Sequence, residues 1–155
     1  LGNIGKEVAK RALGLGMKVV ACDPNVTATD LNVTLMTKQD LLRSADYISL
    51  HIPLDKKTGA AITKNEFDLM KKGVVLINCA RGGVVSEKDL LEALKTGKVS
   101  RAAMDVFESE PPTQEEYELL KHPNVSVTPH IGASTNEAQE RVGEEIARKV
   151  VQALK

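Results

Sequence analysis

The chain has 155 residues, 42% of them hydrophobic and only 3% aromatic, which predicts one domain with an aliphatic core. Basic and acidic residues number 21 each, so the formal net charge is zero and there is no basic excess of the kind that nucleic-acid partners require. No apolar run is long enough for a membrane span or a signal peptide, and two cysteines cannot form a disulfide framework, so we expect a cytoplasmic protein with no membrane partner.

The start of the chain carries half of a nucleotide-binding pattern. The segment Leu1-Gly2-Asn3-Ile4-Gly5 leads directly into helical spacing of apolar residues, and a short strand from Met17 to Cys22 follows and ends at Asp23. A glycine turn, a helix, a strand and an acidic residue roughly 20 positions later make up the second half of a dinucleotide-binding unit. The preceding strand and the first glycine of the pattern are missing, so we expect a chain that starts inside its own motif.

The two glycines indicate a nucleotide site only in combination with Asp23. An acidic side chain at the tip of the second strand can accept hydrogen bonds from both ribose hydroxyls of NAD. An Asp-Pro turn also accounts for Asp23, and a Gly-x-x-Gly pair can open any helix. Taken together, Gly2, Gly5 and Asp23 favour a bound NAD.

The next segments alternate helix and strand. Thr37-Lys38-Gln39-Asp40 predicts the start of a short helix through Ser44, and a third strand is expected from Tyr47 to Ile52. His51 falls at the end of this strand, beside the expected cofactor crevice, although a histidine packed at a strand end is the commoner case, so His51 is only a supporting candidate. A further helix is predicted to begin at Thr63-Lys64-Asn65-Glu66.

The most apolar stretch, Gly73 to Ile77, is followed by Asn78-Cys79-Ala80-Arg81-Gly82-Gly83. Such a run between glycines is typical of a strand buried on both faces of a parallel sheet. Ligands of open α/β sheets bind at the carboxyl ends of the strands, so Arg81 is a candidate for binding an anionic group. An arginine in a loop can instead hydrogen-bond the last carbonyls of a helix.

An acidic loop follows the next predicted strand. A helix beginning at Ser86-Glu87-Lys88-Asp89 leads to a strand from Val99 to Val106, and then to Phe107-Glu108-Ser109-Glu110-Pro111-Pro112. The two prolines restrict the backbone after Glu110 and so orient its carboxylate. An ordinary solvated loop accounts well for Glu108 and less well for Glu110.

The last strand is expected from Val125 to Thr128, after a short helix from Tyr117 to Lys121. It leads into Pro129-His130-Ile131-Gly132-Ala133-Ser134, and Ser134-Thr135-Asn136-Glu137 predicts the start of a long final helix. His130 therefore lies on the ligand side of the sheet, although a simple loop histidine is the alternative.

Strands that alternate with helices throughout predict an α/β fold with a doubly wound parallel sheet, a Rossmann-like domain over residues 1–155. Five strands are predicted, and the missing strand before Leu1 would be the sixth. An arginine can bind a carboxylate, a histidine can move a hydroxyl proton, and a glutamate can orient and charge that histidine. Arg81, Glu110 and His130 together suit hydride transfer between a 2-hydroxy acid and a nicotinamide, with no metal.

Three segments resemble the signatures of the D-isomer-specific 2-hydroxyacid dehydrogenases: residues 78–83, residues 105–112 and residues 129–135. They occur in the family's order, and the resemblance covers nearly the whole chain. It implies that Arg81 is the catalytic substrate-binding arginine, Glu110 the glutamate paired with histidine, and His130 the acid/base. It also implies NAD contacts at Asn3, Ile4, Asp23, Ile52, Cys79, Ala80, Asp105, Gly132 and Ala133. Gly2, Gly5, His51, Arg81 and His130 complete the candidate NAD-binding set.

Within the family, the resemblance is greatest to the enzymes that oxidise 3-phosphoglycerate to 3-phosphohydroxypyruvate at the entry to serine biosynthesis. No phosphate-reading residue is identifiable, so glycerate, hydroxypyruvate or lactate stays open as the substrate. An NAD-sensing module like the corepressors that resemble this family is a non-enzymatic alternative.

The resemblance also bears on the organisation of the protein. It implies a homo-oligomer, a dimer or tetramer, and a substrate domain that is absent from this chain, so we expect residues 1–155 alone to be inactive. Arg101 stands where the family usually has a small residue, and Ser86 stands in place of a common aspartate. We therefore expect Arg101 to need extra room at the start of a buried strand.

Overall fold

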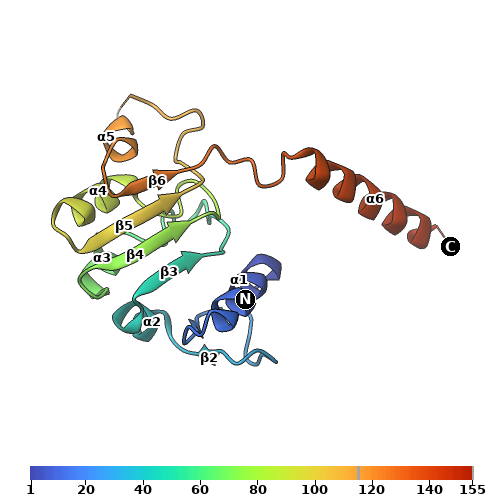
Figure 1. Ribbon diagram of the computed structural model, residues 1–155, viewed down its shortest axis with the longest axis horizontal. Helices are drawn as coiled ribbons and strands as arrows, with labels where there is room; N and C mark the ends of the chain where they lie inside the picture. Colours follow the sequence, from blue (N-terminus) through green and yellow to red (C-terminus); the bar gives the residue numbers. More distant parts are fainter. Residues whose placement is uncertain (115, 155) are drawn as a thin grey trace.

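Six short strands and six helices make up the described part of the chain, residues 1–114 and 116–154, in this computed structural model (Figure 1). The strands are β1 Val20–Ala21, β2 Thr34–Leu35, β3 Tyr47–Leu50, β4 Val74–Asn78, β5 Val99–Met104 and β6 Val125–Val127. The helices are α1 Asn3–Gly14, α2 Lys38–Ser44, α3 Lys64–Leu69, α4 Glu87–Lys95, α5 Tyr117–Leu120 and α6 Asn136–Ala153.

Every strand pairing is parallel, which confirms the predicted α/β class. The order β3-β4-β5-β6 forms a four-stranded sheet, and β1 and β2 form a separate two-stranded sheet. The sequence analysis missed β2, because two residues are too few to show an alternating pattern.

The start of α1 lies between the carboxyl ends of the two sheets. The amino group of Leu1 is paired with the carboxylate of Asp23, just after β1. Gly5 lies against the residue after β3, since a methyl group added there would be 3.6 Å from Cβ of His51. The turn before α1 thus joins two strand ends that belong to different sheets. That a further strand precedes Leu1 stays a prediction.

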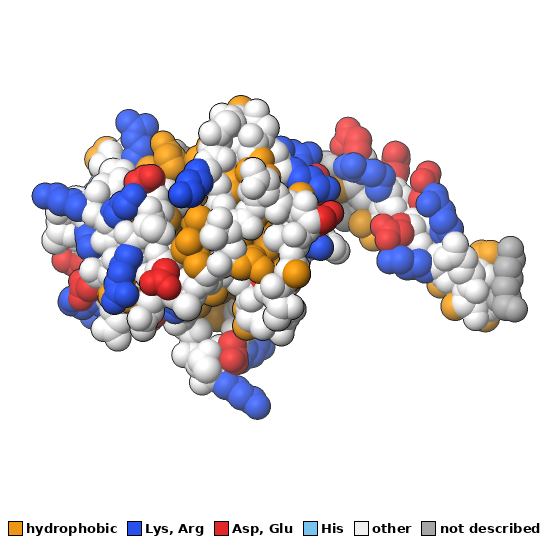
Figure 2. All heavy atoms as spheres, turned by 90° about the horizontal axis from the view of Figure 1, so that it is seen from below, with side chains coloured by type: hydrophobic (Ala, Val, Ile, Leu, Met, Phe, Trp, Pro, Cys, Tyr) orange, Lys and Arg blue, Asp and Glu red, His pale blue; other side chains and the backbone are white. Residues whose placement is uncertain are grey.

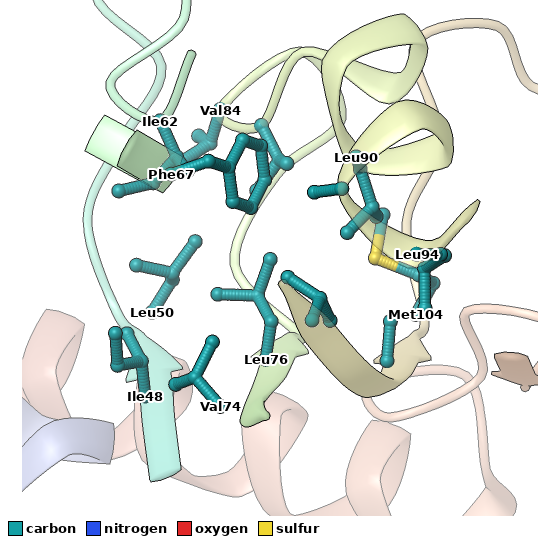
Figure 3. Packing of buried hydrophobic residues seen from close by; sticks show 14 of the residues in the cluster. Ile48, Leu50, Ile62, Phe67, Val74, Leu76, Val84, Leu90, Leu94 and Met104 are labelled. Atoms are coloured by element: carbon teal, nitrogen blue, oxygen red, sulfur yellow. The ribbon is translucent and has the colours of Figure 1, made fainter. Parts of the chain in front are cut away.

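The core lies on one face of the four-stranded sheet. Side chains of β3, β4 and β5 meet Phe67 of α3 and Leu90 and Leu94 of α4 (Figure 3). Val74, Leu76 and Asn78 are buried in β4, whereas Val75 and Ile77 between them are only partly buried. The prediction that this strand is buried on both faces is therefore wrong: α3 and α4 cover one face, and the other keeps exposed side chains such as Tyr47.

Three helix starts follow the predicted capping chemistry. The side chain of Thr37 accepts the Asp40 amide at 3.2 Å, and Glu66 accepts the Thr63 amide at 3.0 Å. At α6 the cap is Thr135, which accepts the Ala138 amide at 3.2 Å and lies within the predicted segment.

Arg101 does not crowd the core. The pairing of β4 with β5 shifts by one residue between Val74 and Val75, so that Val75 stands opposite Arg101. The Arg101 side chain is exposed on the open face, where it lines a hollow of about 520 Å³ together with Asp46 and Tyr47. The expected packing conflict at this position is therefore absent.

Helix α6 extends away from the sheets at the end of an irregular segment (Figure 1). It has no buried residue among those described, and Figure 2 shows charged side chains of both signs along it. Val142, Ile146 and Val150 form an exposed apolar row on the same helix. Among the described helices, α6 included, none is long and apolar enough to cross a membrane.

Candidate active site

The predicted site residues all lie at the carboxyl ends of strands or at the start of α1. Asp23 follows β1, His51 and Ile52 follow β3, and Arg81 follows β4. Asp105 and Glu110 follow β5, and His130, Gly132 and Ala133 follow β6. Because all strands are parallel, these segments share one edge of the fold, which is the edge where ligands of such sheets bind.

The turn that carries Arg81 is held by a buried amide. Asn78 is 1% exposed, its Oδ1 accepts the Ala80 amide at 3.1 Å, and its Nδ2 donates to the Arg81 carbonyl at 3.2 Å. The Arg81 guanidinium donates to the Ala80 carbonyl at 2.6 Å and has no recorded bond to Glu110 or His130 among the described residues. Sequence reasoning missed the role of Asn78, although a lone polar residue at the end of an apolar strand was its signal.

The loops after β4 and β5 touch through their backbones. A methyl group added to Gly82 would lie 1.6 Å from the carbonyl oxygen of Phe107, so no side chain fits there. This approach places the turn of Arg81 against the loop of Glu110. The two candidate residues are thus connected by the main chain rather than by their side chains.

Glu110 and His130 form a direct pair. Oε2 of Glu110 lies 3.0 Å from Nδ1 of His130, and its Oε1 accepts the Phe107 amide at 3.3 Å. The hydrogen bond to His130, supported by that amide, lowers the pKa of Glu110, so the carboxylate is the stable form. A carboxylate only accepts, so Nδ1 carries the proton and Nε2 is left as the basic nitrogen.

His130 is held in an unusual backbone conformation. Its φ is +54°, in the left-handed region, which costs a non-glycine residue on the order of 1–3 kcal/mol. Asp105 helps to hold it, since its Oδ1 accepts the His130 amide at 3.1 Å and also bonds the Thr128 hydroxyl. Strain that neighbouring groups maintain is typical of functional positions.

The start of α1 carries several of the residues that we predict to bind NAD. Gly2 caps this helix without a side-chain hydrogen bond, and Asn3, Ile4 and Gly5 form the first turn. The free amides of such a turn suit a phosphate group. His51 is within 2.9 Å of the Ser49 hydroxyl, and partial burial lowers its pKa.

Asp23 and Cys79 lie at the same edge, after β1 and β4. The Asn25 amide donates to Oδ1 of Asp23 at 2.9 Å, a bond that favours the carboxylate form. The Cys79 thiol is exposed and unpaired, while partial burial and Asp105 raise its pKa and keep it neutral. The edge therefore presents acceptors and free amides, and the described residues show no group of metal ligands.

Comparisons with known proteins agree with the observed fold. The family model described as D-isomer specific 2-hydroxyacid dehydrogenase, NAD binding domain, matches residues 1–132. A hydroxypyruvate reductase of Thermotoga maritima is 50% identical over 154 residues, which are 99% of this chain and 50% of that protein. A D-3-phosphoglycerate dehydrogenase of Bacillus subtilis is 48% identical over 158 residues, covering 100% of this chain and 30% of that protein.

A solved structure supports the fold in the same way. The crystal structure of a D-lactate dehydrogenase from Aquifex aeolicus, in complex with NAD and lactic acid, superposes with a TM-score of 0.86 at 38% identity. The match covers 99% of this chain and 50% of that one, and it confirms a Rossmann-like arrangement. This chain thus spans half or less of the length of these three proteins.

Proposed function

Because the chain belongs to the D-isomer-specific 2-hydroxyacid dehydrogenase family, whose NAD-binding domain it carries, we propose that its protein is an NAD-dependent D-2-hydroxyacid dehydrogenase. The observation that carries the proposal is the pair of Glu110 and His130 at 3.0 Å, on the edge where the start of α1 and Asp23 also lie. An oriented histidine beside a nucleotide-binding turn is what an alcohol-to-carbonyl oxidation needs.

The residues present fit NAD. The amides at the start of α1 suit the pyrophosphate, and the Asp23 carboxylate suits the ribose hydroxyls. When bound, NAD supplies the acceptor for the hydride that leaves the substrate. Asp23 also disfavours NADP, because its negative charge would face the additional 2′-phosphate.

Residues of the chain itself accept the hydroxyl proton of the substrate and bind its carboxylate. His130 accepts the hydroxyl proton at Nε2, because Nδ1 is held by Glu110. Glu110 keeps the ring in one orientation and stabilises its charged form. Arg81 binds the substrate carboxylate through its planar fork of N–H donors, for which the side chain turns away from the Ala80 carbonyl.

For the substrate we propose 3-phosphoglycerate, oxidised to 3-phosphohydroxypyruvate. This proposal is supported by the Bacillus subtilis relative, which is named a D-3-phosphoglycerate dehydrogenase. The Thermotoga maritima relative, named a hydroxypyruvate reductase and of similar identity, favours reduction of hydroxypyruvate as the second candidate.

The test is a substrate panel with the full-length protein. Initial rates with NAD and NADP are measured for 3-phosphoglycerate, glycerate and lactate, and with NADH for hydroxypyruvate. We expect the highest kcat/KM for 3-phosphoglycerate with NAD, and a preference for NAD over NADP on the order of a hundredfold. A higher value for hydroxypyruvate would select the second candidate. If the protein binds NADH but turns over none of these acids, the enzymatic proposal is wrong and the protein is an NAD-sensing module.

A further inference from the structure

Three carboxyl groups lie close together beside the loop that carries Glu110. Glu87 is the first residue of α4, Glu108 lies in the loop after β5, and Glu116 precedes α5. Glu87 is only 6% exposed, which is unusual for a glutamate without a cation beside it. The proposed proton transfer at His130 assigns no task to this cluster.

Glu87 and Glu108 bond each other's backbone reciprocally. The Glu108 amide donates to Oε1 of Glu87 at 2.6 Å, and the Glu87 amide donates to a Glu108 carboxylate oxygen at 3.0 Å. The two bonds fasten the start of α4 to the loop after β5. The Glu108 side chain is therefore a helix cap and not the solvated loop carboxylate expected from the sequence.

The other oxygen of Glu87 needs a proton. Oε2 is buried, and as a carboxylate oxygen it has no hydrogen-bond partner among the described residues. The Glu116 carboxylate is near enough to Glu87 to help raise the pKa of Glu87, and a proton on Glu87 would turn this repulsion into a hydrogen bond. Two carboxylates in contact repel, whereas an acid and a carboxylate share a hydrogen bond.

The proton belongs on Glu87 rather than on Glu116. Glu116 accepts the Ser109 amide at 2.9 Å and also the Thr113 amide, and these bonds favour its charged form and help to lower its pKa. Burial, together with Glu108 and Glu116, raises the pKa of Glu87 to about 7. Among the described residues, the charged groups that act on the pKa of Glu87 are two carboxylates, Glu108 from the loop after β5 and Glu116 from the segment before α5.

We propose that Glu87 is a positioning residue for Glu110, acting as a neutral acid that holds Glu116 and, through it, both ends of the segment from Ser109 to Thr113. Glu110 lies inside this segment, so the clamp fixes the carboxylate that orients His130. The inference rests on the proposed function for its catalytic meaning, but the clamp itself is a structural property. Its loss loosens the segment whether or not the protein is a dehydrogenase.

The clamp is closed at low pH and opens as Glu87 loses its proton. The folded form keeps this proton up to about pH 7, whereas a free glutamate loses it near 4.5. Glu87 therefore lowers the free energy of unfolding as the pH rises between these values. The amide hydrogens of Ser109 and Thr113 should lose protection as the pH rises through about 7.

The test is amide hydrogen exchange in the full-length wild type, Glu87→Gln and Glu87→Leu, at about pH 6 and about pH 8, corrected for intrinsic rates. The glutamine keeps one acceptor for the Glu108 amide and a donor for Glu116, and it does not titrate. In the wild type, protection of Ser109 and Thr113 should fall roughly tenfold from the lower to the higher pH. Glu87→Gln should keep its protection at both pH values, and Glu87→Leu should lose it at both.

Glu66→Gln is the matched control, because Glu66 also lies at a helix start but bonds Thr63 and Lys38 instead of this loop. It should leave the exchange of Ser109 and Thr113 unchanged. In activity assays, Glu87→Leu should lower kcat while the KM for NAD stays constant, and Glu87→Gln should restore kcat.

The proposal is overturned if the protection of Ser109 and Thr113 changes equally between the two pH values in the wild type and in Glu87→Gln. This comparison can be made even if Glu87→Leu fails to fold. If every form lacks dehydrogenase activity, the proposed function fails, and the exchange data still decide whether the clamp exists.

Discussion

At the scale of single residues, the site depends on a few groups whose backbone is fixed by other side chains. Asn78 holds the turn of Arg81, and Asp105 holds the amide of His130. Both are short polar side chains that satisfy main-chain groups at strand ends, where the ladder hydrogen bonds stop. The geometry of the site is therefore built into the ends of β4 and β5.

Glu110→Gln tests the pair with His130 at this scale. The amide keeps the size of the side chain and removes the negative charge that stabilises a protonated histidine. Hydrogen bonds to charged groups contribute about 1.5–3 kcal/mol, so we expect kcat/KM to fall roughly 10- to 100-fold. Steady-state kinetics of the full-length protein measure this.

The control for this substitution is Glu118→Gln. Glu118 is an exposed glutamate of α5, and its side chain pairs with Lys95 of α4 at 2.9 Å. The substitution should leave kcat/KM within about twofold, because exposed ion pairs contribute little. Equal kinetics for the wild type and Glu110→Gln would show that Glu110 does not act on His130.

Gly82→Ala tests the contact between the two loops. The added methyl group would lie 1.6 Å from the Phe107 carbonyl oxygen, so the loop after β5 must move. We expect a loss of about 1–3 kcal/mol in the free energy of unfolding, together with lower activity, because Glu110 moves with this loop. Denaturant unfolding and kinetics measure the two effects.

Gly143→Ala in α6 is the matched glycine control. No atom lies within 4 Å of the added methyl group, and alanine in a helix interior is better than glycine by about 0.5–1 kcal/mol. A loss of stability as large as that of Gly82→Ala would mean that the loop contact does not explain the requirement for glycine at position 82.

At the scale of elements, β4 is the strand on which the core and the site both depend. Its pairings with β3 and β5 lie at the centre of the four-stranded sheet, and its carboxyl end supplies Asn78 and the turn of Arg81. Only one face of the strand is buried under α3 and α4. Alanine substitutions on the two faces of β4 should therefore differ in their cost in unfolding free energy.

Leu76→Ala should cost about 2–5 kcal/mol of unfolding free energy, because Leu76 is 0% exposed and its removal leaves a cavity. Ile77→Ala is a nearly isosteric comparison on the opposite face, where the side chain is only partly buried, and it should cost clearly less. Urea unfolding of both variants gives the two values. Equal losses would show that the second face is covered in solution as well.

At the scale of the whole molecule, the described chain consists of a sheet body and a helix that does not pack on it. Helix α6 has no buried residue among those described, and its row of apolar side chains faces solvent. Its stability therefore comes from its own backbone, its cap and pairs such as Lys149 with Glu145 at 2.7 Å.

Amide exchange in residues 1–155 tests this division. The amides of β4 should exchange only through opening of the sheet body, whereas those of α6 should exchange by local fraying and much faster. Exchange rates resolved by residue give the comparison. Protection of α6 as strong as that of β4 would mean that the helix packs on the body, contrary to the structure.

The sequence by itself determined the alternation of helices and strands, several helix starts and the order of the candidate residues. These features depend on local chemistry: Thr37 and Thr63 begin helices because their neighbours within three positions complete a cap. The location of Arg81, Glu110 and His130 at one edge also followed from sequence, because every parallel strand ends on the same side.

Only the tertiary structure decided which of these groups touch and which do not. Glu110 and His130 are 20 positions apart, and Glu87 and Glu108 are 21 apart, so neither pair leaves a local pattern in the sequence. The fit of Gly82 against Phe107, the division into two sheets and the open face of β4 likewise depend on how distant segments pack. Local propensity selects the elements, but burial and hydrogen bonding between remote segments set their contacts, and no short stretch of sequence contains that information.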